Sequence, residues 1–108
     1  MLSEAADDRD ARLAAWPALV QALLTQDMLA DSPLACGLLA AVGLGLAGDS
    51  RGFARDSETE HALVLREVGR LADELKFLVI VRTDERTQRR FLALSEAGRT
   101  LIDGQSID

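Results

Sequence analysis

The sequence predicts one small domain that is mainly α-helical, with a single short β-hairpin near its C-terminal end. The length of 108 residues suits one domain with one core and is too short for two ordinary domains. Aromatic residues make up only 4% and tyrosine is absent, so Leu, Val and Ala must fill the core, which favours helices. Apolar residues also recur at steps of three and four along most of the chain, the period of an amphipathic helix. An all-β architecture is therefore not expected.

The first predicted helix covers residues 13–29, where apolar side chains form one stripe. The stripe consists of Leu13, Trp16, Leu19, Val20, Leu23, Leu24 and Met28. Pro17 fits best in the first turn of a helix, so we expect the regular part to begin near Ala15 or Trp16. The preceding residues 1–12 are acidic and polar, and we expect them to form a disordered or frayed N-terminus.

A second helix is predicted over residues 33–46 and is apolar on nearly all sides. Ser32 is placed to cap its N-terminus, and Pro33 suits its first helical position. A helix that is apolar all round belongs at the centre of the domain. Its apolar run is shorter than the ~20 residues that span a bilayer and is interrupted by glycines, so we expect no membrane partner.

The N-terminal residues and the cysteine content together favour a cytoplasmic protein. The first twelve residues, MLSEAADDRDAR, are acidic where a signal peptide would have basic residues followed by an apolar stretch. Cys36 is the only cysteine, so it has no partner for an intramolecular disulfide, which fits a reducing compartment. We interpret it as a small buried apolar residue.

A polar segment and a long amphipathic helix follow. The segment GDSRGFARDSE, residues 48–58, contains two glycines and can hold only a short helix around residues 50–55. The next helix is predicted over residues 59–76. Its apolar positions are Ala62, Leu65, Val68, Leu71, Ala72 and Leu75, with Leu63 and Val64 broadening the apolar face.

The C-terminal part of the chain predicts a β-hairpin and a last short helix. FLVIV at residues 77–81 and RFLAL at residues 90–94 are β-branched, aromatic or apolar runs of strand length. The polar residues between them are too few for a crossover and suit a long hairpin loop. Ser95 is placed to cap a helix that runs through Ile102. The domain is therefore expected to cover residues 13–103, with residues 104–108 as a tail.

This order of elements, together with particular residues, resembles the winged helix-turn-helix of MarR-type bacterial transcriptional regulators over residues 34–103. In that family an Ala in the first helix of the motif is followed by apolar positions ten, fourteen and seventeen residues later. The matching positions here are Ala54, Val64, Val68 and Leu71. The segment LSEAGRTLI, residues 94–102, is similar to the family segment Leu-Thr-x-x-Gly-Arg-x-Leu-Leu that leaves the wing and opens the last helix. The resemblance implies a winged helix-turn-helix with an extra N-terminal helix.

The resemblance also implies a DNA-binding site on the predicted 59–76 helix and on the hairpin loop. The helix residues expected to face the major groove are His61, Ala62, Leu65 and Arg66, of which Arg66 is the best base reader. The loop residues expected to reach phosphates or the adjacent minor groove are Arg86, Arg89 and Arg90. An alternative interpretation is a solvated loop in which these arginines pair with Asp84 and Glu85.

The partner that the resemblance implies is double-stranded DNA, and the function is that of a DNA-binding transcriptional regulator. A homodimer would form through the N- and C-terminal helices, with each subunit reading one half-site. The sequence does not define the operator, the regulated gene or a small-molecule effector.

The charge of the chain supports a second hypothesis, a winged-helix protein–protein interaction module without DNA binding. The formal net charge is -6, whereas nucleic-acid-binding domains usually have a basic excess. Residues 1–31 have two arginines against six acidic residues, and residues 82–99 have five arginines against three. Glu58 and Glu60 would also place negative charge at the N-terminal end of the recognition helix, close to where DNA phosphates would lie.

No residue pattern predicts an enzyme, a metal site or a cofactor. His61 is the only histidine and has no cysteine nearby in the sequence, so no metal-ligand set is formed. The chain also lacks a phosphate-binding glycine loop, a nucleophile elbow and a paired-cysteine motif. We therefore expect no catalytic residues.

Overall fold

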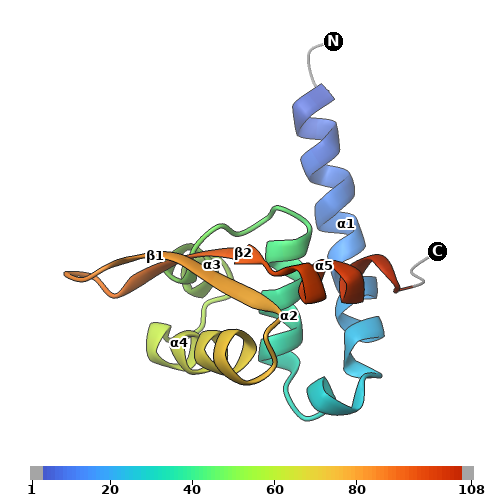
Figure 1. Ribbon diagram of the computed structural model, residues 1–108. Coiled ribbons are helices and arrows are strands. Elements are labelled where there is room, and N and C mark those ends of the chain that lie inside the picture. Colours follow the sequence, from blue (N-terminus) through green and yellow to red (C-terminus); the bar gives the residue numbers. More distant parts are fainter. Residues whose placement is uncertain (1–3, 106–108) are drawn as a thin grey trace.

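The computed structural model describes residues 4–105 of the chain, with side chains from residue 8 onward, and contains five α-helices and one antiparallel hairpin in that range (Figure 1). The α-helices are α1 (Glu4–Leu24), α2 (Pro33–Gly43), α3 (Ser50–Asp56), α4 (His61–Gly69) and α5 (Glu96–Asp103). A 3-10 turn, η1 (Asp27–Leu29), follows α1, and a π-helical turn, η2 (Arg70–Glu74), continues α4. The strands are β1 (Leu78–Asp84) and β2 (Arg89–Leu94). The expected mainly α-helical class with one small hairpin is confirmed.

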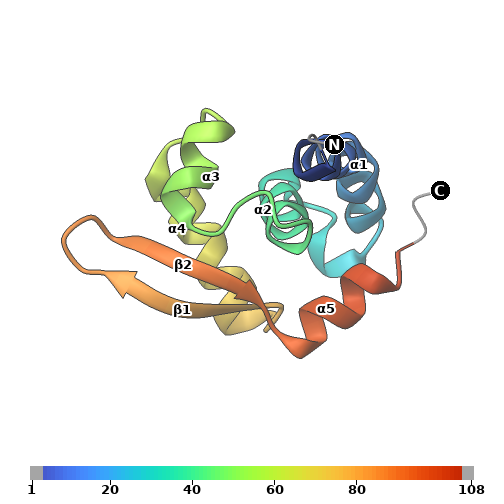
Figure 2. The ribbon, with the colours of Figure 1, turned by 90° about the horizontal axis from the view of Figure 1, so that it is seen from above.

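Helix α2 lies at the centre, with other elements on several sides (Figure 2). Its residues 35–41 are all buried, as expected for a helix that is apolar all round. Helices α1 and α5 lie on one side of α2, and α3, α4 and the hairpin lie on the other. The core is built mainly from Leu, Val and Ala, and Phe53 is its only aromatic residue with less than 9% exposure among the described residues.

Helix α1 differs from the prediction at both ends. It begins at Glu4 and so includes residues that we expected to be frayed. The helix ends at Leu24, and the expected continuation to residue 29 is a turn followed by η1. Residues 1–3 and 106–108 of the expected N-terminal segment and tail lie outside the described residues.

Pro17 lies inside α1, so the prediction that it occupies the first turn is wrong. The helix starts much earlier than the proline-based argument assumed, because the acidic residues before Leu13 are helical. Pro17 is exposed, whereas the neighbouring Trp16 is half-buried. The indole Nε1 of Trp16 donates a hydrogen bond to the Gly37 carbonyl oxygen at 3.0 Å, which joins α1 to α2.

The start of α2 follows the sequence prediction. The Ser32 hydroxyl accepts a hydrogen bond from the Ala35 backbone N–H at 3.1 Å, and Pro33 occupies the first turn. The helix ends at Gly43, before the expected Leu46. Gly45 then has a positive φ of 72°, which glycine adopts without the strain that a Cβ would cause.

The hairpin is longer than the sequence suggested and contains a bulge. Strand β1 pairs with β2 in antiparallel register from Leu78 opposite Leu94 to Asp84 opposite Arg89. The register shifts between Ile80 and Arg82, so the intervening Val81 has no strand partner. The polar residues at 82–84 extend β1, and the Arg82 guanidinium lies 4.1 Å from the centroid of the Phe91 ring. The loop is therefore a tight turn rather than a long polar connection.

Helix α5 begins as expected, with the Ser95 hydroxyl accepting a hydrogen bond from the Gly98 N–H at 2.9 Å. Gly98 is buried, and a Cβ at this position would collide with the backbone carbonyl oxygen of Phe77. The close approach of the two backbones therefore requires glycine at position 98. At the other end of α5, a Cβ on Gly43 of α2 would lie 3.3 Å from atoms of Ile102. Within the described residues, none of the helices has the length and apolar character needed to cross a membrane.

We predict opposite effects of alanine at two glycines. Gly98→Ala should lower the free energy of unfolding by about 1–3 kcal/mol, because the backbone of Phe77 must shift. Gly69→Ala is the matched control: no atom lies within 4 Å of the added Cβ, and alanine there should stabilise by about 0.4–1 kcal/mol. Urea unfolding followed by Trp16 fluorescence measures both. Equal stabilities for the two variants would contradict the close contact at Gly98.

Candidate nucleic-acid interface

The residues predicted from the sequence to bind DNA lie on α4 and the hairpin. Both elements are on the side of the molecule away from α1 and α5, and the hairpin extends past α4 to a free end (Figures 1 and 2). The buried side of α4 consists of Val64, Glu67 and Val68. The opposite side of α4 is therefore available to a partner.

Three of the four helix residues belong to this available side of α4. Ala62 and Arg66 are exposed, and Leu65 is half-buried. The Arg66 side chain is 76% exposed, and its Nε lies 3.9 Å from a carboxylate oxygen of Glu67. A contact at that distance and exposure constrains the guanidinium only weakly, so Arg66 is free to reach a ligand.

His61, the fourth helix residue, points into the molecule rather than outward. Its Nε2 lies 2.8 Å from the hydroxyl of Ser50, which is fully buried. The same hydroxyl accepts a hydrogen bond from the Arg90 backbone N–H at 2.9 Å. The pKa of His61 is lowered from its ordinary value, mainly because the ring is partly buried, and nearby Arg51 adds to the effect. The ring of His61 is therefore part of a contact between α4, α3 and β2.

The three hairpin arginines have different surroundings. Arg86 is exposed in the turn, and its backbone N–H is bonded to Asp84 at 3.0 Å. Arg89 is partly exposed, and its Nε lies 3.3 Å from Asp49 at the N-terminus of α3. Arg90 is half-buried. Within residues 8–105, no ion pair joins these arginines to Asp84 or Glu85, so the pairing considered for a solvated loop is not formed.

The segment Gly48–Arg51, which we call the junction, holds the hairpin against α3. The Leu92 N–H donates to the Gly48 carbonyl oxygen at 2.9 Å, and Asp49 forms a β-bridge with Phe91. The Asp49 carboxylate caps α3 by accepting a bond from the Gly52 N–H at 2.9 Å. Arg51 donates from Nε and Nη2 to the Thr87 carbonyl oxygen at 3.3 and 3.2 Å, close to the turn of the hairpin.

Sequence reasoning missed the junction. Asp49 stands directly before a helical segment, so its capping role could have been found from the usual preference for Asp at that position. The contacts of Ser50 and Arg51 with the hairpin join residues 36 to 40 positions apart, and no local pattern indicates such pairs.

A second polar cluster anchors the other end of α4. Glu67 is only 7% exposed, and its Oε1 accepts a hydrogen bond from the Ser32 hydroxyl at 3.3 Å. The Arg70 guanidinium lies 3.9 Å from Glu67 and donates to the Met28 carbonyl oxygen at 2.7 Å and to Asp31 at 3.2 Å. Because a buried carboxylate needs such partners, this cluster fixes α4 and η2 against η1 and the start of α2.

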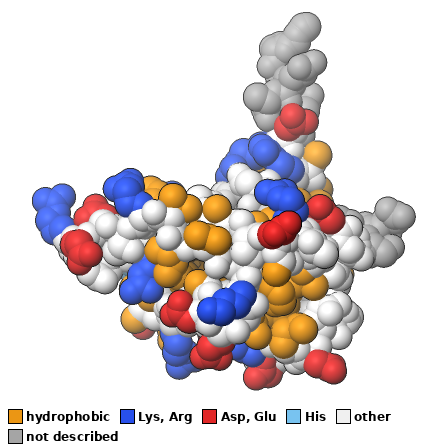
Figure 3. All heavy atoms as spheres, in the orientation of Figure 1, with side chains coloured by type: hydrophobic (Ala, Val, Ile, Leu, Met, Phe, Trp, Pro, Cys, Tyr) orange, Lys and Arg blue, Asp and Glu red, His pale blue; other side chains and the backbone are white. Residues whose placement is uncertain are grey.

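Positive and negative charges are balanced over the part of the chain that carries the candidate interface. Residues 49–94 contain nine basic and nine acidic residues, so the excess negative charge of the chain lies outside them. In the space-filling view, Lys and Arg side chains gather at the free end of the hairpin beside acidic ones (Figure 3). Glu58 and Glu60, just before α4, are both exposed. The surface is therefore mixed rather than uniformly basic.

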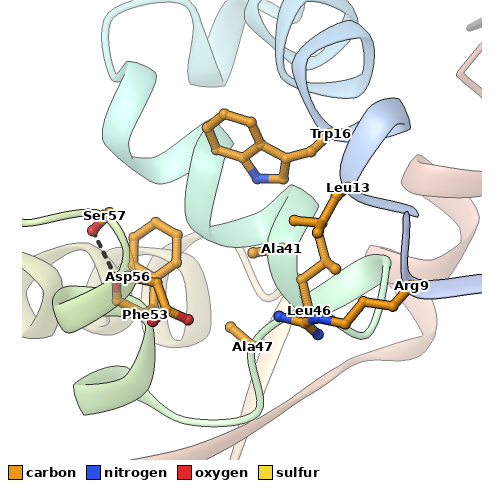
Figure 4. Close-up of a pocket in the computed structure, with 9 residues that line it drawn as sticks. All are labelled: Arg9, Leu13, Trp16, Ala41, Leu46, Ala47, Phe53, Asp56 and Ser57. Carbon is orange, nitrogen blue, oxygen red and sulfur yellow. Dashed lines mark hydrogen bonds between the residues drawn. The ribbon is translucent and has the colours of Figure 1, made fainter. Parts of the chain in front are cut away.

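A pocket of about 200 Å³ lies between α1, α2 and α3 (Figure 4). Its walls are mostly apolar and are formed by Leu13, Trp16, Ala41, Leu46, Ala47 and Phe53. The exposed residues Arg9, Asp56 and Ser57 complete the lining. Among the described residues, none from α4 or the hairpin lines this pocket, so it is separate from the candidate interface.

Residues 8–105 contain no group of three or more His, Cys, Asp or Glu side chains placed to hold a metal ion. Cys36 is fully buried, and burial raises the pKa of its thiol to about 11, so it is protonated at neutral pH. Comparison of the chain with family models, with curated proteins and with solved structures finds no match.

We predict that Ser50→Ala weakens the junction. The change removes the acceptor of the Arg90 N–H and the partner of His61, and it should lower the free energy of unfolding by about 1–3 kcal/mol. The amide hydrogen of residue 90 should also exchange faster with solvent. Thr100→Ala removes an exposed hydroxyl on α5, to which no side-chain hydrogen bond is assigned among the described residues; as the control, it should change stability by about 0.5 kcal/mol or less. Unchanged exchange at Arg90 in Ser50→Ala would contradict the role given to the junction.

Proposed function

We propose that the chain is a winged helix-turn-helix domain that binds double-stranded DNA and acts as a transcriptional regulator of MarR-like type. The observation that carries this proposal is that Arg66 and Arg86 are both exposed and belong to α4 and the hairpin, which lie on the side of the molecule away from α1 and α5. A cytoplasmic location is part of the proposal, because a transcriptional regulator acts where the DNA lies.

The packing of α3 against α4 supports the helix-turn-helix assignment. Helix α3 ends at Asp56, and α4 begins at His61 after a short turn that contains Glu58 with a positive φ of 54°. The four positions whose spacing matches the MarR pattern are all buried in the core: Ala54, Val64, Val68 and Leu71. This burial is what the motif requires, because these residues hold its two helices together.

The hairpin and the junction support the assignment of a wing. Strands β1 and β2 follow α4 and η2 directly, and the β-bridge between Asp49 and Phe91 adds a short third strand segment at the edge of the hairpin. The order of helices and strands from α2 to α5 is the order that the MarR-like resemblance implies. We therefore assign α4 as the recognition helix and the β1–β2 hairpin as the wing.

In a DNA complex, α4 would enter the major groove with its N-terminal half. Arg66 can donate two hydrogen bonds to a guanine, and Ala62 and Leu65 can contact the methyl group of thymine. Arg86 would reach a phosphate or the adjacent minor groove. Arg89 and Arg90 would act mainly through the hairpin that they hold in place, because Arg89 pairs with Asp49 and Arg90 is half-buried.

The arrangement of the terminal helices supports a homodimer. Helices α1 and α5 both lie on the side of α2 that faces away from the wing (Figure 2). The N-terminal half of α1 extends beyond the rest of the molecule, and Leu13 in it is 47% exposed (Figure 1). A second subunit placed on this side would leave both recognition helices free, so each could read one half-site.

The alternative function is a winged-helix protein–protein interaction module without DNA binding. It is favoured by the exposed Glu58 and Glu60 before α4 and by the equal numbers of basic and acidic residues over 49–94. A phosphate backbone close to these glutamates would be repelled. A protein partner with basic side chains would instead pair with them.

Fluorescence anisotropy distinguishes the two functions. The protein is titrated onto the DNA upstream of its own gene and onto a scrambled duplex, across a series of salt concentrations. The regulator predicts tight binding to the upstream DNA only, with affinity that falls as salt rises. Absence of binding to both duplexes at low salt, by protein shown to be folded, would favour the interaction module.

We predict different losses for two arginine variants. Arg66→Ala should lower affinity for the upstream DNA by about 1–3 kcal/mol and reduce its preference over the scrambled duplex. Arg86→Ala should weaken binding to both duplexes equally. It should also reduce the slope of log affinity against log salt concentration by about one, because one phosphate contact is lost. Arg12→Ala on α1 removes the same charge far from α4 and the hairpin and is the matched control, used once its oligomeric state is shown to equal that of the wild type. An equal effect of all three variants would contradict the assigned roles, because it would reflect net charge alone.

A further inference from the structure

The single histidine of the chain lies where α3, α4 and β2 meet. His61 is the first residue of α4, its Nε2 is 2.8 Å from the Ser50 hydroxyl, and the ring is half-buried. His61 belongs to the helix that would enter the major groove, and Ser50 contacts the wing by accepting a hydrogen bond from the Arg90 N–H. The protonation state of one imidazole is therefore connected to both parts of the DNA-binding surface.

The hydrogen bonds of Ser50 accommodate both forms of the His61 ring. Ser50 Oγ already accepts the Arg90 N–H, so its own proton is free to point to an unprotonated Nε2 of a neutral ring. When Nε2 is protonated it becomes a donor, and the second lone pair of Ser50 Oγ can accept from it. Protonation thus reverses the direction of this bond without removing it, and the Ser50 hydroxyl proton loses Nε2 as its acceptor, which adds to the cost of protonation in the free protein. The junction can keep its geometry in both states.

The charges that face His61 oppose its protonation in the free protein. Arg51 on α3 and Arg89 and Arg90 on β2 are all close enough to lower the pKa of the ring, and Asp49 is the acidic residue that acts against them. Partial burial is the largest cause and has the same direction as the arginines. The partial positive charge at the N-terminus of α4 adds to this effect. At neutral pH the ring is therefore neutral.

A bound duplex would reverse this balance. Phosphates that approach the N-terminus of α4 and the hairpin bring negative charge close to Arg51, Arg89 and Arg90, whose positive charge opposes protonation of His61 in the free protein. We propose that His61 binds a proton when the domain binds DNA, which makes DNA affinity rise as the solution becomes more acidic. This inference rests on the proposed DNA-binding function and adds a means of regulation to the same site.

The direction of the pH effect follows from linkage. If the pKa of His61 is higher in the complex than in the free protein, the protein takes up a proton when it binds DNA. Affinity then rises as pH falls through the range between the two pKa values. A difference of one pKa unit corresponds to a tenfold change in affinity, so we expect an increase of about three- to tenfold between pH 8 and pH 5.5. In the free protein the same lowered pKa has the opposite consequence: stability falls as pH drops below the ordinary value for histidine.

The proton uptake can be observed directly, because His61 is the only histidine. Its ring carbon and proton signals are followed by NMR from pH 5 to pH 8, first in the free protein and then with saturating duplex at low salt. We expect one titration below the ordinary histidine pKa in the free protein and one at higher pH in the complex. The same or a lower pKa in the complex would overturn the proposal.

An affinity measurement separates this proposal from the proposed function. Anisotropy titrations with the same duplex at several pH values compare the wild type with His61→Gln, which keeps a hydrogen-bonding side chain but does not titrate. Between pH 8 and pH 5.5, the affinity of the wild type should rise about three- to tenfold more than that of His61→Gln. If both proteins bind DNA with identical pH dependence, the proposed role of His61 is overturned, whereas the proposed DNA-binding function is not. Absence of binding by folded wild type at every pH would overturn both proposals.

Discussion

The arrangement of the proposed DNA-binding side depends on one buried hydroxyl group. Ser50 begins α3, has no exposed surface, and bonds both the backbone of β2 and the ring that begins α4. A two-stranded hairpin is only marginally stable by itself, so its orientation must come from contacts with other elements. The bonds of Gly48, Asp49 and Arg51 to the hairpin supply the rest of that support. The hairpin and α4 are thereby held as one unit.

This constraint shapes the proposed chemistry of recognition. At the junction, the charged and ionisable groups Asp49, Arg89 and His61 have structural partners, whereas Arg66 and Arg86 are exposed and free to contact a ligand. Phosphate contacts position a protein on DNA, and contacts to base edges carry specificity, so the two free arginines would have separate tasks. The balanced charge of residues 49–94 limits nonspecific attraction, and a mixed surface of this kind makes affinity depend on a few well-placed contacts.

Local sequence signals predicted the elements well and the contacts between them poorly. The caps at Ser32 and Ser95, the apolar periodicity of α2 and α4, and the two strands were all found, because each depends on residues close in sequence. Pro17 was placed wrongly because the acidic residues before it were not expected to be helical. His61 was expected on the surface and Glu67 was not noticed, since their partners Ser50 and Ser32 lie 11 and 35 positions away. Such pairings become visible only when the helices are packed.

The central claim is that α4 and the free end of the hairpin form one DNA-binding surface. The most direct test is an NMR titration of the isotope-labelled protein with a short duplex at low ionic strength, where phosphate contacts suffice for binding. We expect the amide signals of residues 61–66 and 85–88 to shift together, with one affinity, while those of α1 remain unchanged. Shifts confined to α1 and α5, or separate affinities for helix and hairpin, would contradict the central claim.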